Sequence, residues 1–451
     1  MNKLKKFGIA LVATVTLGTA APSISFGPFT VQTATEVSAA TAAPKIEAKA
    51  AFAIEPTTGK VLLNQNGDEQ LGIASMTKMI VEYILFDAIE KGDISWDQQV
   101  PVSEYAHEIS HNTSLSNVML RQDETYSVKE LYQALAIYSA NGATIALAEA
   151  MAGSEPEFVD RMKAQLDEWG IKDYALYNAT GLNNSDLKGN IYPGSTDKDE
   201  NSMTARGVAE VAQHLINDYP EALKTTSVPK MTFRKGTSDA IDMSNWNWML
   251  EGLLFERDNV DGLKTGTTNF AGACIAGTAE ENGMRIVTVV MNAKDGQKDK
   301  GSRFKETDKL MDWTFANWEK VDLYEKGDTL KDVDALAVTK GKQKSVELAA
   351  GTETAVVLPD GTDKKDISVS FEPNNKIINN DGELTAPAKK GTEVGKAQIN
   401  IKGDDLGYLE KTTGEELPAV TKTAVEKANV FVLAGRSVGD FFSDLYHKVV
   451  K

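Results

Sequence analysis

Three short polar motifs constrain the fold of this 451-residue chain more than any other feature. They are Ser75-Met-Thr-Lys78, Ser139-Ala-Asn141 and Lys264-Thr-Gly266, in that order. Serine, lysine and asparagine at these spacings can act together only if they share one cleft. The fold must therefore bring together residues that lie almost two hundred positions apart in the sequence.

The context of each motif, rather than its letters, selects the copy that matters. Lys-Thr-Gly occurs once, whereas Ser-x-Asn also occurs at residues 110–112. Ser-x-x-Lys recurs at residues 185–188, 195–198, 227–230 and 302–305. Only Ser75 precedes a long apolar stretch of helical character, residues 76–91, with Gly92 as a stop signal. We therefore expect Ser75 and Lys78 at the start of a helix.

Composition excludes several classes of protein. The apolar fraction of 41% and the charged fraction of 25% are typical of globular domains. A net charge of −17 argues against nucleic acid as a partner. A single cysteine, Cys274, excludes an internal disulfide, and its small apolar neighbours indicate a buried thiol. The four histidines form no zinc signature, so we expect neither a metal nor another cofactor.

The N-terminus has the pattern of an export signal. Lys3, Lys5 and Lys6 precede an apolar run, residues 7–21, and Val37-Ser-Ala39 offers a cleavage site. We expect residues 1–40 to be a signal peptide, and the remainder to act outside the cytoplasmic membrane.

The next part, residues 46–320, is expected to form an α/β (α+β) domain. Residues 51–54 and 61–63 read as a β-hairpin, and residues 284–291 as an inner strand. Helices are expected at residues 128–137, 141–152 and 302–318. The segment around Lys264 reads as an edge strand.

Two further regions follow. Residues 321–420 show the strict alternation of a small antiparallel β domain, as in residues 367–371 and 397–401. Residues 425–451 are expected to end in an amphipathic helix whose apolar positions run from Val438 to Val450. That helix either lies on a membrane surface, which we favour, or packs against the β domain.

The motifs suggest serine acyl transfer without a histidine. Residues three apart share one helix face, so the Lys78 amine is expected beside the Ser75 hydroxyl. To act as a base, Lys78 must be neutral, which requires its pKa to fall by about three units. Burial and a second ammonium, that of Lys264, would lower the pKa in this way.

The remaining motif residues have roles as donors and relays. Ser139 can pass a proton to a leaving amine, and Asn141 can orient Lys78 or hold a substrate amide. Thr265 and Gly266 leave room for a peptide to lie along the edge strand. The backbone N–H groups of Ser75 and Thr267 would form an oxyanion hole. The alternative interpretation is that these residues are helix caps and an exposed strand lysine.

The chain resembles the low-molecular-mass (class C) penicillin-binding proteins that are D-alanyl-D-alanine carboxypeptidases, peptidase family S11. The resemblance rests on residues 73–78 (Ile-Ala-Ser-Met-Thr-Lys), residues 178–182 (Asn-Ala-Thr-Gly-Leu), the other two motifs and the C-terminal organisation. It implies a β-lactamase/transpeptidase-like catalytic domain, a β domain and a membrane-anchoring helix. One departure is Thr267, where some members have histidine.

The resemblance also implies roles and a substrate. Ser75 resembles the acylated nucleophile and Lys78 the proton acceptor, with Ser139 and Asn141 as the second motif. Lys264 looks like the substrate-binding lysine, and Arg303 like the arginine that receives the terminal carboxylate. The expected partners are peptidoglycan stem peptides ending in D-Ala-D-Ala, β-lactams and the membrane surface. Alternatives are a β-lactamase and a non-catalytic penicillin-binding sensor.

Overall fold

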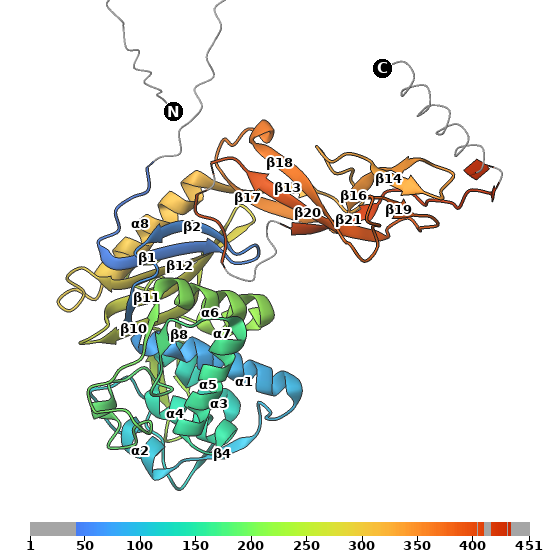
Figure 1. Cartoon of the computed structure of the whole chain (residues 1–451). Coiled ribbons are helices and arrows are strands. Elements are labelled where there is room, and N and C mark those ends of the chain that lie inside the picture. Colours follow the sequence, from blue (N-terminus) through green and yellow to red (C-terminus); the bar gives the residue numbers. More distant parts are fainter. Residues whose placement is uncertain (1–41, 404, 410–415, 431, 434–451) are drawn as a thin grey trace, which may run out of the picture. The chain divides into compact units, whose positions relative to one another are not determined.

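The structure is a computed structural model that describes residues 42–403, 405–409, 416–430 and 432–433. Its central element is a five-stranded antiparallel sheet with the order β10-β11-β12-β1-β2 (Figure 1). The strands are β1 (Ala48–Glu55), β2 (Lys60–Gln65), β10 (Val260–Thr268), β11 (Gly272–Glu281) and β12 (Met284–Ala293). The predicted hairpin, the inner strand β12 and the edge strand β10 are all confirmed.

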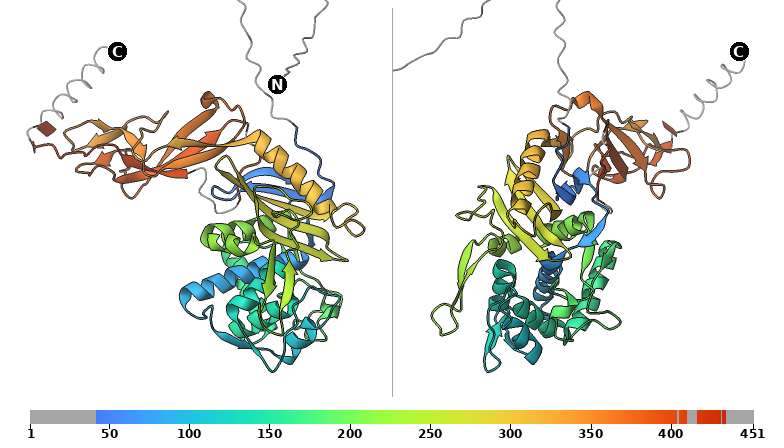
Figure 2. Two further views of the ribbon diagram at one scale, coloured as in Figure 1. Left: turned by 180° about the vertical axis from the view of Figure 1, so that it is seen from behind. Right: turned by 90° about the vertical axis from the view of Figure 1, so that its left-hand side faces the viewer.

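Alternate residues of the sheet face two separate cores, because side chains of a strand point to opposite faces. Phe52 and Val289 belong to a core shared with most of the helices. Ala53 packs in the other core with Leu310 of α8 (Ser302–Asn317). The sheet is therefore the middle of three layers, which can be followed in the two views of Figure 2.

Seven further α-helices and several short elements complete this part of the described chain. The helices are α1 (Lys78–Lys91), α2 (Glu104–Ser110), α3 (Val128–Tyr138), α4 (Asn141–Ala152), α5 (Glu155–Trp169), α6 (Ala205–Asp218) and α7 (Leu223–Thr226). The 3₁₀ turns are η1 (Ala74–Thr77), η2 (Asn184–Asp186) and η3 (Pro220–Ala222). Three small antiparallel sheets are also present in this part. One has the order β3 (Gln70–Gly72), β7 (Ser202–Thr204) and β6 (Tyr174–Ala175). The other two pair β4 (Gln99–Pro101) with β5 (Thr125–Ser127), and β8 (Lys230–Phe233) with β9 (Ile241–Ser244).

The helices that carry the motifs begin and end at sequence signals. Ser127 and Glu130 form a reciprocal capping box at the start of α3, which satisfies N–H groups that have no partner within the helix. Helix α3 ends at Tyr138 and is followed by the C-cap residue Ser139, whose backbone is left-handed with φ 58°. The predicted helix over residues 76–91 is confirmed in extent, but its first turn is the 3₁₀ turn η1, and α1 begins at Lys78.

The β domain begins with β13, three residues before the expected boundary at residue 321. Its strands are β13 (Trp318–Tyr324), β14 (Leu336–Thr339), β15 (Ser345–Val346), β16 (Leu348–Ala350), β17 (Thr354–Pro359), β18 (Ile367–Pro373), β19 (Leu384–Thr385), β20 (Glu393–Ile401) and β21 (Glu416–Thr421), with the 3₁₀ turn η4 (Lys364–Asp366) before β18. They form sheets with the orders β16-β21-β20-β18, β13-β17 and β15-β14-β19. All pairings are antiparallel as expected except that of β14 with β19, which is parallel.

Two predictions concern residues that the structure does not describe. The expected signal peptide and the apolar positions of the expected terminal helix lie outside the described residues. Within the described residues, no helix has the length and apolar character needed to span a membrane.

Candidate active site

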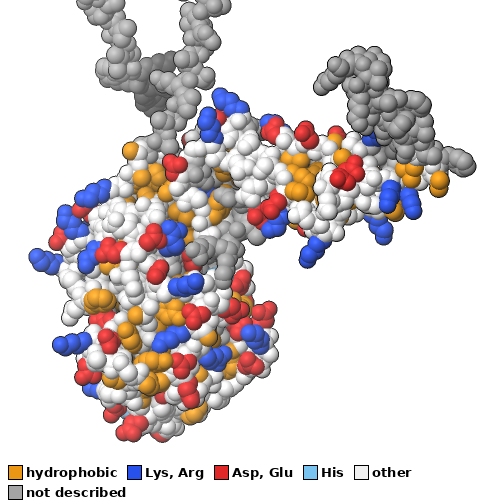
Figure 3. Space-filling view, viewed as in Figure 1, with side chains coloured by type: hydrophobic (Ala, Val, Ile, Leu, Met, Phe, Trp, Pro, Cys, Tyr) orange, Lys and Arg blue, Asp and Glu red, His pale blue; other side chains and the backbone are white. Residues whose placement is uncertain are grey.

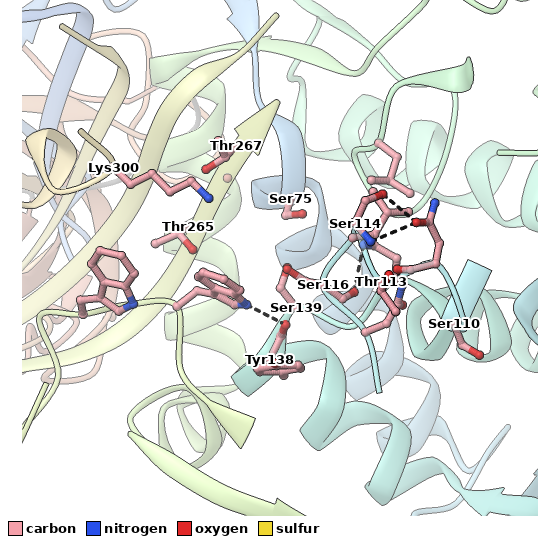
Figure 4. Close-up of a pocket in the computed structure, with 18 of the residues that line it drawn as sticks. Ser75, Ser110, Thr113, Ser114, Ser116, Tyr138, Ser139, Thr265, Thr267 and Lys300 are labelled. Carbon is pink, nitrogen blue, oxygen red and sulfur yellow. Dashed lines mark hydrogen bonds between the residues drawn. The ribbon is translucent and has the colours of Figure 1, made fainter. Parts of the chain in front are cut away.

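The three motifs converge on one cleft of about 520 Å³. Ser75 lies on η1, Ser139 at the junction of α3 and α4, and Thr265 and Thr267 on β10. Figure 4 shows Ser75 between the strand that carries the two threonines and the loop that carries residues 113–116. The cleft is lined by Ser75, Ser110, Asn112, Thr113, Ser114, Leu115, Ser116, Asn117, Met119, Tyr138, Ser139, Asn141, Leu182, Trp246, Trp248, Thr265, Gly266, Thr267, Lys300, Arg303 and Phe304.

Two glycines let neighbouring segments approach the turn that carries Ser75. Gly266 of β10 packs against this turn so closely that an added Cβ would lie 2.6 Å from the carbonyl oxygen of Ile73. A Cβ on Gly181 would lie 1.8 Å from the carbonyl oxygen of Ala74, and Gly181 also has a positive φ of 76°. Only glycine satisfies both conditions, so close backbone contact fixes the position of Ser75.

The Lys78 amine makes three contacts that together define its chemistry. Its Nζ lies 2.7 Å from the carbonyl oxygen of Thr180, 2.8 Å from Asn141 Oδ1 and 3.1 Å from Ser75 Oγ. A neutral amine has two N–H donors and one lone pair, and the first two oxygens can only accept. A neutral Lys78 that donates to these two oxygens would leave its lone pair for the Ser75 hydroxyl, which also lies 3.5 Å from the carbonyl oxygen of Thr180.

The surroundings of Lys78 favour the neutral amine. The side chain is fully buried, and burial lowers its pKa well below the ordinary value of 10.5. The positive charge of Lys264 lowers the pKa further, while the carboxylates of Glu155 and Glu82 act in the opposite direction. Both predicted causes, burial and a second ammonium, are thus present.

The second motif lies beside the lysine. Asn141 Nδ2 donates to the carbonyl oxygen of Ser116 at 3.1 Å, which turns Oδ1 toward Lys78. Ser139 is 4% exposed and lines the cleft, and its left-handed backbone turns the chain from α3 into α4. Both residues are therefore brought to the place that the sequence predicts.

The third motif forms the open side of the cleft. Thr265, Gly266 and Thr267 line the cleft, and strand β10 has no further strand on its outer side within the described sheet. Lys264 does not line the cleft; it is 2% exposed, and its Nζ donates to the carbonyl oxygen of Thr265 at 3.2 Å. Burial lowers the pKa of Lys264 to about 8, and the charge of Glu82 opposes this shift.

Arg303 holds the edge strand in place. Its Nη1 donates to the carbonyl oxygens of Gly266 at 2.7 Å and of Cys274 at 2.9 Å, and Nη2 donates to Thr267 Oγ1 at 2.7 Å. Nε donates to the carbonyl oxygen of Lys300 at 3.1 Å. Four of its five N–H groups are thus used by the protein. The arginine reaches the cleft, as predicted, and most of its hydrogen-bonding capacity fixes β10 to β11.

Several groups at the site belong to none of the three motifs. The carbonyl oxygen of Thr180 contacts Lys78 through its backbone, which no side-chain motif encodes. Tyr138, Trp246 and Trp248 form a stacked aromatic wall, and the Lys300 ammonium lies 5.8 Å from the Trp246 ring. Glu82 was detectable, since it interrupts an otherwise apolar helical run.

Cys274 takes no part in this chemistry. It is fully buried, its thiol donates to the carbonyl oxygen of Ala271 at 3.3 Å, and burial raises its pKa to about 11. A thiol with a raised pKa is a poor nucleophile, as expected from the sequence.

The chain matches the family model of D-alanyl-D-alanine carboxypeptidases, peptidase family S11, over residues 36–295. The model of the penicillin-binding protein 5 C-terminal domain matches residues 318–427. The D-alanyl-D-alanine carboxypeptidase DacF of Bacillus subtilis is 30% identical over 395 residues, 88% of this chain and 90% of the relative. DacC of Escherichia coli is 31% identical over 413 residues, 90% of each chain.

Solved structures show the same similarity. The crystal structure of PBP3 from Streptococcus pneumoniae, a peptidoglycan synthesis regulatory factor, is 36% identical with a TM-score of 0.72; the match covers 85% of this chain and all of that one. Penicillin-binding protein 5 from Haemophilus influenzae is 28% identical with a TM-score of 0.66, covering 86% of this chain and all of that one.

The mixed α/β fold and a serine hydroxyl paired with a buried lysine define a serine-type hydrolase of the penicillin-binding class. The first family model alone covers more than half of the chain. The chain therefore belongs to the D-alanyl-D-alanine carboxypeptidases of peptidase family S11, the low-molecular-mass penicillin-binding proteins.

Proposed function

We propose that this carboxypeptidase removes the terminal D-alanine from peptidoglycan stem peptides through an acyl-enzyme on Ser75. The observation that carries the proposal is the set of contacts of Lys78 Nζ, which leaves the lone pair of a neutral amine for the Ser75 hydroxyl. A hydroxyl that donates to a neutral amine is activated for attack, because the amine takes its proton as the new bond forms.

The reaction proceeds in two halves. Ser75 Oγ bonds to the carbonyl carbon of the penultimate D-alanine, its proton passes to Lys78, and the C–N bond breaks. Ser139 relays a proton to the leaving amine, so that D-alanine departs neutral at nitrogen. Water then attacks the ester, and the proton that it loses ends on Ser75 as the hydroxyl is restored. A β-lactam acylates Ser75 by the same attack.

The substrate binds along β10. The backbone N–H groups of Ser75 and Thr267 stabilise the oxyanion, and the open edge of the strand accepts the peptide backbone. Lys264, Thr265, Thr267 and the remaining N–H of Arg303 attract the terminal carboxylate. These assignments are supported by Thr265, Thr267 and Arg303, which line the cleft, and by Lys264, which lies on the strand that borders it.

The test is release of D-alanine from a peptide that ends in D-Ala-D-Ala. The wild-type protein should release one D-alanine per peptide, and Ser75→Ala should release none above background. The matched control is Ser185→Ala, which alters another Ser-x-x-Lys sequence at an exposed position of the 3₁₀ turn η2. A Ser75→Ala protein that retains full activity would refute the assignment.

We also propose that the enzyme works on the outer face of the cytoplasmic membrane, held there by its C-terminal helix. The support is the sequence pattern alone: an export signal over residues 1–40 and apolar positions at helical spacing from Val438 to Val450. Deletion of residues 430–451 should move the active enzyme from the membrane fraction to the soluble fraction. Retention of the truncated enzyme at the membrane would contradict this anchor.

A further inference from the structure

A buried carboxylate lies one helical turn beyond the catalytic lysine. Glu82 occupies the fourth position after Lys78 on α1, so both side chains share one face of that helix. It is 1% exposed, and its Oε2 accepts only a long hydrogen bond from the Tyr132 hydroxyl, at 3.5 Å. Its Oε1 has no hydrogen-bond partner among the described residues. Such a group is costly unless a nearby opposite charge compensates for the lost water.

The opposite charge comes from β10. Lys264 is as deeply buried as Glu82, and its ammonium donates to a neutral acceptor, the carbonyl oxygen of Thr265. The attraction between the Glu82 carboxylate and the Lys264 ammonium favours the charged form of both groups. Lys78, by contrast, is surrounded by neutral oxygen atoms within hydrogen-bond distance.

Charged and titratable groups approach this cluster from three more elements. Tyr132 contacts Glu82 from α3, and the Arg303 charge acts on Lys264 from α8. From α5, Glu155 acts on Lys78, but both of its oxygens are occupied: Oε2 accepts from the Tyr105 hydroxyl at 2.7 Å and Oε1 from the backbone N–H of Ala179 at 2.9 Å. Of these two carboxylates, it is Glu82 whose charge acts on Lys264.

We propose that Glu82 is a positioning residue that keeps Lys264 protonated in the buried cluster while Lys78 stays neutral. The proposal rests on the proposed function, in which the two lysines need opposite protonation states: one is a base and the other attracts a carboxylate. Two ammonium groups buried near each other repel, so at most one is favoured. The charge of Lys264 acts on Glu82 more strongly than that of Lys78 does, so the buried carboxylate favours the proton on Lys264.

The burial and the charges around the two groups shift their pKa values in agreement with this arrangement. Burial lowers the pKa of Lys264 to about 8, and the negative charge of Glu82 is the influence that holds it up. Burial raises the pKa of Glu82 itself to about 7, while the charges of both lysines and the Tyr132 hydroxyl act to lower it. Without the carboxylate, Lys264 would lose its proton at a lower pH.

The test is the pH dependence of kcat and KM for Glu82→Gln, measured with a peptide that ends in D-Ala-D-Ala. Glutamine keeps the size of the side chain and a hydrogen bond to Tyr132, but it removes the charge. We expect KM to rise at alkaline pH, where Lys264 loses its proton. In Glu82→Gln this rise should begin at a pH lower by about one unit, so that KM near pH 8 increases several-fold while kcat changes less. Glu149→Gln, a partly buried carboxylate outside the cleft, is the matched control and should leave the profile unchanged.

A Glu82→Gln enzyme that is folded and acylated by penicillin, with a KM profile superimposable on that of the wild type, overturns the proposal. If that variant does not fold, Tyr132→Phe decides. KM should also rise at acidic pH, where Glu82 takes up a proton. Loss of the Tyr132 hydroxyl removes an influence that lowers the pKa of Glu82, so this acidic rise of KM should begin at a higher pH. An unmoved acidic rise overturns the proposal. Failure of the wild type to release D-alanine would instead refute the proposed function.

Discussion

At the scale of single residues, the site depends on two hydrogen-bond acceptors that hold the Lys78 amine in one orientation. Thr180 and Asn141 each offer Lys78 an oxygen that can only accept, so the amine cannot turn its lone pair toward them. Burial removes the water that would otherwise stabilise the ammonium form. In the proposed mechanism, the general base is thus made by two neutral neighbours and by exclusion of water, without a histidine.

This account predicts the effect of a negative charge at residue 141. Asn141→Asp would place a carboxylate about one hydrogen-bond length from Lys78 Nζ, which raises the pKa of the lysine by about 1–3 units. The neutral base would then form only at higher pH, so the acidic limb of kcat/KM should move upward by a similar amount. Measurement of kcat/KM from pH 5 to 10 checks this.

The control for that change is Asn400→Asp on the exposed face of β20, which should leave the acidic limb where it is in the wild type. A folded Asn141→Asp enzyme with an unmoved limb would show that Lys78 is not the titrating base.

The motif residues could be found from the sequence because each is a side chain in a distinctive triplet. Ser75, Lys78 and Asn141 fall together as expected. The contribution of Thr180 could not be found, since any residue type offers the same backbone carbonyl oxygen. The sequence also predicts that Lys264 lies on an edge strand, but not its burial, because β10 packs against η1 and α1, which are distant in the sequence.

At the scale of secondary-structure elements, the site depends on contact between β10 and η1. Gly266 brings the strand so close to the turn that an added Cβ would lie 3.2 Å from the backbone nitrogen of Ser75 and still closer to Ile73. The two proposed oxyanion donors, the N–H groups of Ser75 and Thr267, belong to these two elements. Their separation therefore depends on a residue without a side chain.

Gly266→Ala should accordingly slow acylation more than it destabilises the protein. The methyl group pushes β10 away from η1, which displaces one oxyanion donor; loss of such a donor typically slows reaction about a hundredfold. The packing cost is about 1–3 kcal/mol. Stopped-flow acylation by a fluorescent penicillin and thermal unfolding measure the two effects.

Gly277→Ala on the adjacent strand β11 serves as the control. Its added Cβ would come closest to the end of the flexible Met311 side chain, at 3.1 Å, and would make ordinary contacts with Thr288 and Thr307, so the acylation rate should remain near that of the wild type. Equal rates for the two alanine variants would contradict the role given to the contact of β10 with η1.

Element boundaries were predictable where caps mark them. Gly92 ends α1 with φ 76°, and Ser127 starts α3, both as the sequence indicates. The 3₁₀ turn η1 was not predictable, because it results from tertiary contacts of Gly181 and Gly266 with that turn. The parallel pairing of β14 with β19 could not be predicted either. Alternation of apolar and polar residues determines which face of a strand is buried, but not the direction of the neighbouring strand.

At the scale of the whole molecule, buried carboxyl groups make stability depend on pH. On the face seen in Figure 3, acidic and basic side chains are interspersed at the surface. The buried carboxylates Glu82 and Glu155 differ from these, since burial raises the pKa of each to about 7. The native state then holds protons that the unfolded chain, with carboxyl groups near 4.5, has already released.

The sign of the resulting pH dependence follows from that difference. Between about pH 4.5 and 7 the native state binds more protons at Glu155, so its contribution to the free energy of unfolding falls as pH rises. The full shift corresponds to about 3 kcal/mol. In Glu155→Gln this contribution is absent, so the variant should become more stable relative to the wild type as pH rises through this range.

Urea unfolding of both proteins at pH 5, 6, 7 and 8 measures the difference. Glutamine can still accept from the backbone N–H of Ala179 and donate to the Tyr105 hydroxyl, so the contacts remain. A constant difference between the two proteins across these pH values would contradict the assigned titration.

The central claim, that a neutral Lys78 activates Ser75 as the acylated nucleophile, is tested most directly by mass spectrometry of the intact protein and its peptides after brief exposure to penicillin. The account predicts one added penicillin mass, located on the peptide that contains Ser75, with no adduct in Ser75→Ala and much slower labelling in Lys78→Met. An adduct on any other residue, or labelling of Ser75→Ala at the wild-type rate, would contradict it.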